Sequence, residues 1–492
     1  MIKDATSIEI DETVQKAHQA FLMYRSLSGK AKAQLLRKIA DEIEALGDTL
    51  ISTASKESNL PESRLIGERG RTTGQLRLFA SLVEEGSWVE ASIDTAIPDR
   101  QPLPKPDIRK MLIPMGTIVV FGASNFPLAF STAGGDTASA LAAGCTVVVK
   151  AHPAHPETSN LVAQAIWNAL EKCHLPKDIF GHLHGKSADV GRNLVIHPLV
   201  KAVAFTGSFN GGKALFDFAN QRKNPIPVFA EMGSINPVIL LPEALKNRAE
   251  SIATQLAGSI TLGAGQFCTK PGILIGVENT DLEKFIAMLS EQITYAKPAT
   301  MLYEGIAFNY DCQRRILSAQ NGVKVEAESS TPPEKGQGLP TLASVHAIEF
   351  LKNPTLHEEV FGAFALIIKC KHQGEIQQVI QSLAGQLTAT IIGEKEELLK
   401  SKDFVDALKE IVGRIVFNGV PTGVEVCYSM QHGGVFPATT DSRFTSVGTG
   451  AIKRFVRPVA FQNFPDELLP SELQASNPLN IWRLFNGEWG KI

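Results

Sequence analysis

Three side chains of different chemistry stand in short polar segments along the chain. Asn125 lies in GASNFPLAF, Glu231 in FAEMGSINPV and Cys268 in GAGQFCTK. A cysteine thiolate attacks an electrophilic carbon, a carboxylate takes a proton from water, and a side-chain amide stabilises a developing oxyanion. These residue types would therefore supply the nucleophile, the general base and the oxyanion donor of a covalent reaction at a carbonyl carbon.

Each residue taken alone has a more ordinary explanation. Most free cysteines are small buried hydrophobic residues, most glutamates are solvated, and an isolated asparagine usually marks a turn. Cys145, Cys173 and Cys370 lie within or beside apolar runs and fit the first description. Cys268 differs because its neighbours are polar or backbone-exposing residues: Gly263, Gly265, Gln266, Thr269 and Lys270.

Three further segments turn this set into a recognisable order. CTVVVK, TGSFNGG and HEEVFG join the three above in the sequence asparagine loop, lysine after the next strand, Thr-Gly-Ser turn, glutamate, cysteine and Glu-x-Phe. The chain thereby resembles the aldehyde dehydrogenase superfamily over nearly its whole length. The resemblance implies that Cys268 adds to an aldehyde, that hydride passes to a nicotinamide dinucleotide, and that Glu231 activates the water that hydrolyses the thioester. Asn125 and the backbone N–H of Cys268 would stabilise the oxyanion.

The elements that must hold these segments follow from hydrophobic periodicity. About the first 90 residues carry apolar side chains at helical spacing, among them Leu35, Ile39, Ile43, Leu46 and Leu50. From residue 117 onward, short apolar runs (TIVVFG, CTVVVK, KAVAFTG, PVILL) alternate with amphipathic stretches. This alternation predicts a parallel, doubly wound sheet that binds ligands at the carboxyl ends of its strands. GASNFP, KAHPAHP and TGSFNGG directly follow predicted strands, which places them at that edge.

The predicted class is therefore α/β, and the resemblance specifies the aldehyde dehydrogenase fold: a Rossmann-like parallel sheet for the cofactor, an α/β catalytic domain and an oligomerisation arm. Residues 1–97 and 115–240 are assigned to the helical N-terminal part and the cofactor domain, and the proline-rich stretch 98–114 to the arm. Residues 241–435 form the predicted catalytic domain, and 436–492 a segment that packs back on the chain. We expect the arm to support a homodimer or homotetramer.

The resemblance also identifies residues around the cofactor. Gly207, Ser208 and Gly212 open a helix directly after a strand, so the helix N-terminus can face the pyrophosphate. Glu359 corresponds to the family glutamate that binds the nicotinamide ribose, and Phe361 to the aromatic residue beside it.

The segment KAHP predicts a preference for NADP over NAD. Lys150 corresponds to the family lysine that contacts the adenosine ribose. Many NAD-dependent members have an acidic residue three positions later, where it accepts hydrogen bonds from the ribose and repels a 2′-phosphate. This chain has Pro153 there, so the repulsion is missing. His152 and the more distant Arg192 are expected to add positive charge; the alternative is that both cofactors are used.

Longer stretches such as YSMQHGGVFPATTDSRFTSVG resemble the 2-oxoglutarate semialdehyde dehydrogenases, and NADP-dependent fatty aldehyde dehydrogenases share much of the same pattern. The expected substrate is therefore 2-oxoglutarate semialdehyde, with a long aliphatic aldehyde as the alternative. Candidate substrate residues are Arg71, Phe126, Gln266 and His432. Arg71 is preferred for a substrate carboxylate over four other cations: Arg64, Arg69, Lys270 and Arg443. His432 would tune the thiol or relay a proton, unless it is a solvated loop residue.

Composition restricts the remaining possibilities. A net charge of −3 gives no general attraction to nucleic acid or anionic membranes, and no apolar run is long enough to span a bilayer. The first residues lack the apolar core of a secretory signal. The six scattered cysteines favour a reducing cytoplasm, and neither cysteines nor histidines show the spacing of a metal site. Two other classes remain: a catalytically silent binding protein on the same fold, and a cysteine hydrolase without redox chemistry.

Overall fold

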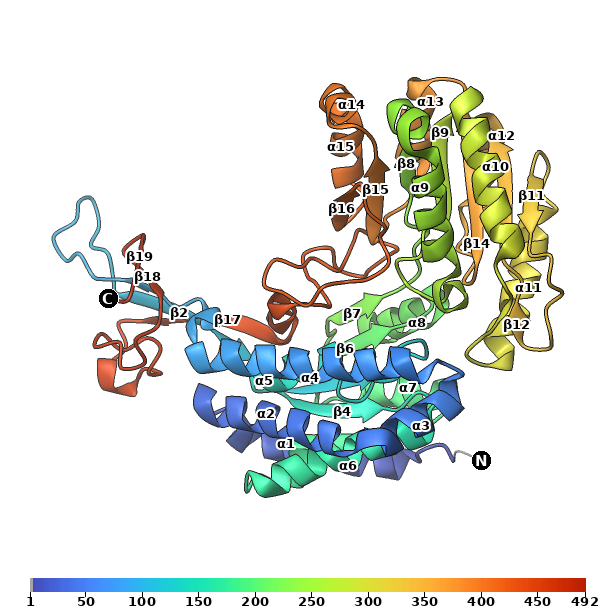
Figure 1. Cartoon of the computed structure of the whole chain (residues 1–492). Coiled ribbons are helices and arrows are strands. Elements are labelled where there is room, and N and C mark those ends of the chain that lie inside the picture. Colours follow the sequence, from blue (N-terminus) through green and yellow to red (C-terminus); the bar gives the residue numbers. More distant parts are fainter. Residues whose placement is uncertain (1–2) are drawn as a thin grey trace.

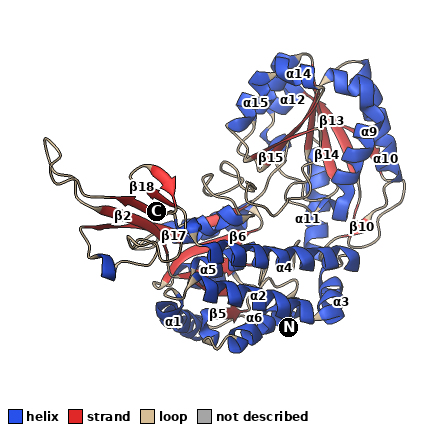
Figure 2. Cartoon of the chain, turned by 60° about the vertical axis from the view of Figure 1, so that its left-hand side comes forward, coloured by secondary structure: helices blue, strands red, loops and turns tan. Residues whose placement is uncertain are grey.

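In the computed structural model, which describes residues 3–492, the chain forms two α/β units and a separate, largely antiparallel extension (Figure 1). Each unit is built on its own parallel or largely parallel sheet, and helices cover both sheets (Figure 2). The predicted α/β class with a Rossmann-like parallel sheet is confirmed. Among the residues described, no helix has both the length and the hydropathy needed to cross a membrane.

The first unit contains a five-stranded parallel sheet in the order β5-β4-β3-β6-β7. Its strands are β3 (Thr117–Phe121), β4 (Thr146–Lys150), β5 (Phe180–Leu183), β6 (Val200–Thr206) and β7 (Val228–Glu231). The register pairs Phe121 with Lys150, and Thr206 with Glu231. Because these residues end their strands, the segments that follow β3, β4 and β6 meet Glu231 at one edge of the sheet.

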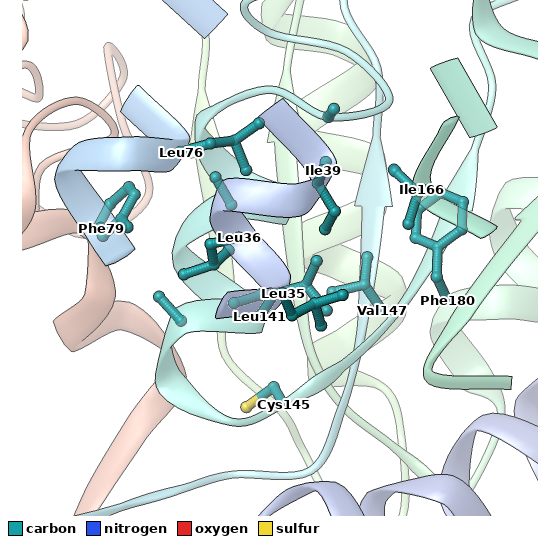
Figure 3. Close-up of a cluster of buried hydrophobic side chains, with 14 of the residues drawn as sticks. Leu35, Leu36, Ile39, Leu76, Phe79, Leu141, Cys145, Val147, Ile166 and Phe180 are labelled. Atoms are coloured by element: carbon teal, nitrogen blue, oxygen red, sulfur yellow. The ribbon is translucent and has the colours of Figure 1, made fainter. Parts of the chain in front are cut away.

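Helices pack on both faces of this sheet through two apolar clusters. They are α1 (Ser7–Tyr24), α2 (Gly29–Ala45), α3 (Gly47–Ser58), α4 (Glu62–Glu85), α5 (Gly135–Ala143), α6 (Pro156–Lys172), α7 (Ala188–Ile196) and α8 (Phe209–Asn220). Figure 3 shows Leu35, Leu36 and Ile39 of α2 beside Leu141 of α5 and Val147 of β4. The predicted N-terminal helical stripe is present but interrupted: Gly47 adopts a φ of 54°, which ends α2 and starts α3 in a new direction.

The second unit has a seven-stranded sheet in the order β11-β13-β14-β9-β8-β15-β16, in which only β11 is antiparallel. The strands are β8 (Val238–Leu240), β9 (Ile273–Val277), β11 (Lys324–Glu328), β13 (Thr341–His346), β14 (Phe364–Cys370), β15 (Thr388–Ile392) and β16 (Arg414–Phe417). Its helices are α9 (Pro242–Thr261), α10 (Thr280–Tyr295), α11 (Glu304–Ser318), α12 (Ala347–Lys352), α13 (Gln373–Ser382), α14 (Lys395–Lys400) and α15 (Lys402–Lys409). A short ribbon, β10 (Ala299–Thr300) with β12 (Gln337–Gly338), lies beside it.

Strand β8 corrects one predicted boundary. The sequence assigned residues 115–240 to the cofactor domain, yet β8 pairs with β9 and β15 of the second sheet. An apolar run of this length suits the centre of either parallel sheet, so periodicity alone does not assign it. The chain leaves the first sheet after β7.

The extension is assembled from three distant segments. Its order is β17-β2-β1-β18-β19, with β1 (Ser92–Asp94), β2 (Ile108–Pro114), β17 (Val456–Gln462), β18 (Arg483–Phe485) and β19 (Glu488–Gly490). Its strand pairs are antiparallel except for the parallel pair of β1 with β18. The predicted arm, residues 98–114, supplies only β2 and the loop before it. Strand β1 belongs here rather than to the N-terminal domain, and the C-terminal segment contributes the other three strands. Both Figure 1 and Figure 2 show this sheet projecting to one side of the α/β units.

Candidate active site

Three of the predicted residues meet where the two units face each other. Glu231 ends β7, Cys268 follows the 3₁₀ turn η3 (Leu262–Gly265), and His432 lies in the loop after β16. The His432 Nε2 atom is 2.9 Å from Glu231 Oε1 and 3.6 Å from Cys268 Sγ. One donor atom from each of the three residues lies within 4.8 Å of the others. The predicted solvated position for His432 is wrong, because its side chain is 1% exposed.

The buried environment separates the charge states of this triad. Burial alone would raise the pKa of Glu231, but the paired His432 and a 2.6 Å hydrogen bond from Ser446 Oγ outweigh it and lower the pKa. Burial and the negative charge of Glu231 raise the pKa of Cys268 well above its ordinary value. Glu231 is therefore a carboxylate, and Cys268 rests as a thiol that needs a base to become nucleophilic.

The asparagine loop is fixed against the cysteine loop. The Asn125 side-chain nitrogen donates to the backbone carbonyl of Gln266 at 3.1 Å, and Arg64 donates to the backbone carbonyl of Asn125 at 2.7 Å. The Arg64 guanidinium lies 4.9 Å from the ring centre of Phe126 and 4.6 Å from that of Phe267. These contacts bring the amide of Asn125 to the loop that carries Cys268, where an oxyanion donor is needed.

Helix α4 presents a polar face to the same place. Glu68, 5% exposed, accepts the backbone N–H groups of Leu128 and Ala129 at 2.8 and 2.9 Å. The Arg71 guanidinium carbon lies 5.4 Å from the Phe130 ring centre, and the Nε and Nη2 atoms are buried without a hydrogen-bond partner among the described residues. Burial lowers the pKa of Arg71, while the charges of Cys268 and nearby carboxylates oppose that effect. Arg71 thus has spare donors directed into a water-poor site.

Three of the other proposed carboxylate-binding cations are engaged elsewhere, while Arg64 keeps one buried donor, Nη1, without a partner among the described residues. Arg69 donates to the carbonyl of Gly47, buried Lys270 donates to two backbone carbonyls, and exposed Arg443 pairs with Asp441. Gln266 is also committed: its amide nitrogen donates to Gly263 and its oxygen accepts from Leu302. The prediction that Gln266 meets the substrate is not supported, because the loop uses both ends of this side chain.

The predicted pyrophosphate turn has the expected geometry. Ser208 caps α8, accepting the Gly211 N–H at 3.3 Å, and the Gly207 N–H donates to the carbonyl of Glu231 at 3.0 Å. A Cβ at Gly212 would lie 2.7 Å from the Met232 side chain. Close packing of α8 therefore requires glycine there and holds the positive end of the helix dipole at the edge that carries Glu231.

The adenosine side is less charged than the sequence suggested. Lys150 is half-buried at the end of β4, and burial lowers its pKa to about 8. Burial, followed by the charges of His155 and Lys150, lowers the pKa of His152 well below its ordinary value. His152 stacks on His155 with ring centres 5.5 Å apart and is neutral. Half-buried Pro153 follows directly.

The structure corrects the predicted position of Arg192. It is exposed on α7 and lies 6.0 Å from the ring of Phe218, in the C-terminal part of α8. Phe218 lies ten positions after Ser208 along α8, which corresponds to about 15 Å at 1.5 Å per residue. Arg192 is therefore away from the edge where Lys150 lies.

Glu359 and Phe361 are the residues predicted at the nicotinamide ribose. The Glu359 carboxylate is close enough to Gly233 that a Cβ there would lie 2.6 Å from Oε2. Burial raises the pKa of Glu359, and the charge of Lys270 opposes this shift. Phe361 is half-buried two residues later. Gly233 follows Met232 in the loop after Glu231, so this loop lies between Glu231 and the Glu359 carboxylate.

The sequence did not identify Ser446 or Glu68 as site residues, and it indicated Arg64 only as a less favoured carboxylate-binding cation. Ser446 stands in RFTSVG, a segment singled out only for its overall pattern. Arg64, Glu68 and Arg71 have the i, i+4, i+7 spacing of one helix face, and this signal marks a polar stripe on an otherwise packed helix.

Residues 1–443 match the Aldehyde dehydrogenase family. With the parallel cofactor sheet, the Cys268 loop and Glu231 in place, the match is decisive: the chain belongs to the aldehyde dehydrogenase family and is an oxidoreductase that acts on aldehydes. Enzymes of this family use NAD or NADP as hydride acceptor.

Two curated relatives are similar over nearly the full chain. An alpha-ketoglutaric semialdehyde dehydrogenase of Acinetobacter baylyi is 48% identical over 99% of this chain and 92% of its own length. Alpha-ketoglutaric semialdehyde dehydrogenase 2 of Azospirillum brasilense is 48% identical over 98% of this chain and 92% of its own length. Both matches leave little of either protein unaligned.

Solved structures share the fold at lower identity. A glyceraldehyde-3-phosphate dehydrogenase of Methanocaldococcus jannaschii, complexed with NADP, has a TM-score of 0.79 at 21% identity and covers 94% of this chain and 95% of its own. Betaine aldehyde dehydrogenase of Staphylococcus aureus has a TM-score of 0.80 at 18% identity, with 95% and 90% covered. The predicted aldehyde dehydrogenase fold is confirmed.

Proposed function

We propose that this enzyme oxidises 2-oxoglutarate semialdehyde to 2-oxoglutarate, with Cys268 as nucleophile and NADP as the preferred hydride acceptor. The observation that carries the substrate assignment is the pair of buried, unpartnered Arg71 donors beside Cys268. The substrate bears a carboxylate, and a guanidinium binds carboxylates with both oxygens. Two relatives at 48% identity carry the corresponding name.

The reaction begins when the Cys268 thiol loses its proton and the sulfur adds to the aldehyde carbon. The His432–Glu231 pair lies within reach of that proton. Asn125 and the Cys268 backbone N–H donate to the oxyanion of the resulting thiohemiacetal. The bound dinucleotide supplies the acceptor for the hydride that leaves this carbon. A thioester to Cys268 remains.

Hydrolysis of the thioester regenerates the enzyme. Glu231, kept ionised by His432 and Ser446, takes a proton from water as the oxygen attacks the thioester carbon. The C–S bond breaks, the carboxylate product leaves with one proton released to solvent, and the Cys268 thiolate takes up the proton held by Glu231, which restores the thiol and the carboxylate. Glu231 and His432 are buried, whereas Cys268 remains partly exposed.

Arg71→Gln is expected to raise the KM for 2-oxoglutarate semialdehyde about 10–100-fold, because a charge-assisted hydrogen bond contributes about 1.5–3 kcal/mol. The KM for an uncharged aldehyde of similar length should change little. Arg443→Gln, which removes an exposed arginine paired with Asp441, is the matched control. Steady-state kinetics of the three proteins with both substrates makes the measurement. Equal losses for both aldehydes in Arg71→Gln would contradict carboxylate binding.

A long aliphatic aldehyde is the second candidate, favoured by the aromatic contacts of Phe126 with Phe130 and Phe267 at 5.3 and 5.4 Å. These rings offer apolar surface beside Cys268. A kcat/KM for fatty aldehydes far above that for the semialdehyde would transfer the assignment to this candidate.

Preference for NADP rests on the region after β4. Pro153 offers neither a charge nor an acceptor, so nothing at this position repels a 2′-phosphate, and Lys150 provides the nearby cation. His152 contributes a neutral ring. We propose that an anion close to Lys150 restores its full charge, because an opposite charge favours the protonated form.

Pro153→Glu should lower kcat/KM for NADP at least about tenfold more than kcat/KM for NAD, since a carboxylate next to the phosphate costs about 1.4 kcal/mol or more. Pro153→Gln is the control, because it makes the same backbone change without the charge. Both ratios are measured at fixed aldehyde concentration. A clear NAD preference of the wild type, or equal losses in Pro153→Glu, would refute this assignment.

The domain assignment carries a further proposal about assembly. The largely antiparallel extension exposes several large apolar side chains: Ile97, Leu103, Ile108, Trp482 and Trp489. Isolated monomers rarely expose apolar groups in this concentration, and the resembled family pairs subunits through this region. We expect light scattering to give two or four times the chain mass. Deletion of residues 99–104, which lie outside the strands, should weaken assembly while far-UV circular dichroism stays unchanged. A wild-type monomer at micromolar concentration would exclude the proposal.

A further inference from the structure

We propose that Cys268, His432 and Glu231 also form a three-ligand binding site for Zn²⁺ or a similar divalent cation, and that occupancy reversibly inhibits the enzyme. The sequence showed no metal motif because the three residues are far apart along the chain. The fold brings a thiol, an imidazole and a carboxylate together, which are the three ligand types that zinc uses in proteins. The proposal holds whichever aldehyde the enzyme oxidises.

Two of the three ligand separations are close to those of a tetrahedral ion, and the third, between Cys268 and Glu231, is at most 4.8 Å. Bond lengths of about 2.3 Å to sulfur and about 2.0–2.1 Å to nitrogen place these two ligands about 3.6 Å apart at a tetrahedral angle. The observed separation between Cys268 Sγ and His432 Nε2 is 3.6 Å. The 2.9 Å distance from His432 Nε2 to Glu231 Oε1 must open by about 0.4 Å to reach the separation of about 3.3 Å expected for nitrogen and oxygen ligands. The fourth position stays open to water.

The buried imidazole can adopt the tautomer that a metal ligand needs. His432 is only 1% exposed, and its Nδ1 atom has no hydrogen-bond partner among the described residues. If the ring proton moves to Nδ1, the Nε2 lone pair becomes available as a ligand. The Cys268 thiol loses its proton on binding, because zinc binds the thiolate.

Charge and softness select the cation. The thiolate and Glu231 together carry two negative charges in a buried site, and each charge raises the free energy of the other ionised group. A divalent cation neutralises both. The thiolate favours Zn²⁺ and Co²⁺ over Mg²⁺ or Ca²⁺, which prefer oxygen ligands. Arg71 is the opposing positive charge, so affinity is below that of a dedicated zinc site.

Cobalt titration of the reduced wild-type enzyme, without substrate, tests the site directly. We expect one Co²⁺ per chain, with thiolate-to-cobalt charge-transfer absorption and the visible bands of a tetrahedral ion. Zn²⁺ should displace Co²⁺ and inhibit aldehyde oxidation. EDTA should reverse this inhibition. Because binding is measured without substrate, a wrong aldehyde assignment leaves this result unchanged.

Variants separate a built site from simple capture by a thiol. Cys268→Ser should lose the charge-transfer absorption, and His432→Asn should weaken cobalt binding by more than the 10–100-fold typical of losing an outer-shell partner. Cys312→Ser, at a half-buried free cysteine on α11, is the matched control and should bind normally. X-ray absorption of the cobalt-loaded wild type, which needs no variant, should show one sulfur among nitrogen and oxygen ligands. Unchanged affinity in His432→Asn, retained charge transfer in Cys268→Ser, or a cobalt environment without sulfur would overturn the proposal.

Discussion

Cys268→Ala is expected to lose aldehyde dehydrogenase turnover by at least about 10⁴-fold while still binding the dinucleotide. Removal of a catalytic nucleophile typically has an effect of this size or larger, because no covalent intermediate forms. The cofactor contacts assigned above involve α8, Lys150 and Glu359 and do not depend on the thiol. Turnover is measured as reduced cofactor by absorbance, and cofactor binding by fluorescence or calorimetry.

Cys145→Ala serves as the control for this substitution. Cys145 is fully buried in the core of the first unit, where burial raises the pKa of its thiol to about 11. Its replacement should affect stability but leave the kinetic constants of folded enzyme nearly unchanged. Normal turnover in Cys268→Ala would contradict the assignment of Cys268 as nucleophile. It would favour the alternative of a protein that acts by another mechanism.

Glu231→Gln is expected to release about one equivalent of reduced cofactor per active site and then nearly stop. Acylation precedes hydrolysis, so a block of the second step leaves the first visible as a burst. The steady-state rate should fall about 10²–10⁴-fold, the usual contribution of a general base. Glutamine keeps the size of the side chain and a hydrogen-bonding oxygen for Ser446 but cannot accept the proton of water.

Rapid mixing with absorbance detection makes this measurement, with Glu334→Gln at an exposed loop position as control. An unchanged burst and steady state would show that Glu231 is no base. Loss of the burst as well would place Glu231 in thiol activation too, which its position near Cys268 and His432 allows.

Local sequence properties determined the fold class and the order of the candidate site. Strands β3, β4 and β6 are apolar runs, and the polar segment behind each must lie at the carboxyl edge because parallel strands end together. That rule predicts that the segments of Asn125, Lys150 and Ser208 gather at one edge of the sheet, whereas β5, with Gly181 and His182, and β7 carry no such signal. The residue types of Cys268 and Glu231 defined which chemistry was possible.

The partners of these residues were decided only by the tertiary structure. His432 and Ser446 lie about two hundred positions from Glu231, and their hydrogen bonds arise because the loop after β16 returns to the first unit. The same applies to β8, whose apolar residues suited either sheet, and to Arg71, which packing leaves with two buried donors free of protein partners. Periodicity reports which face of an element is buried. It does not report what lies against that face, because distant segments supply the contacts and hydrogen bonds that complete it.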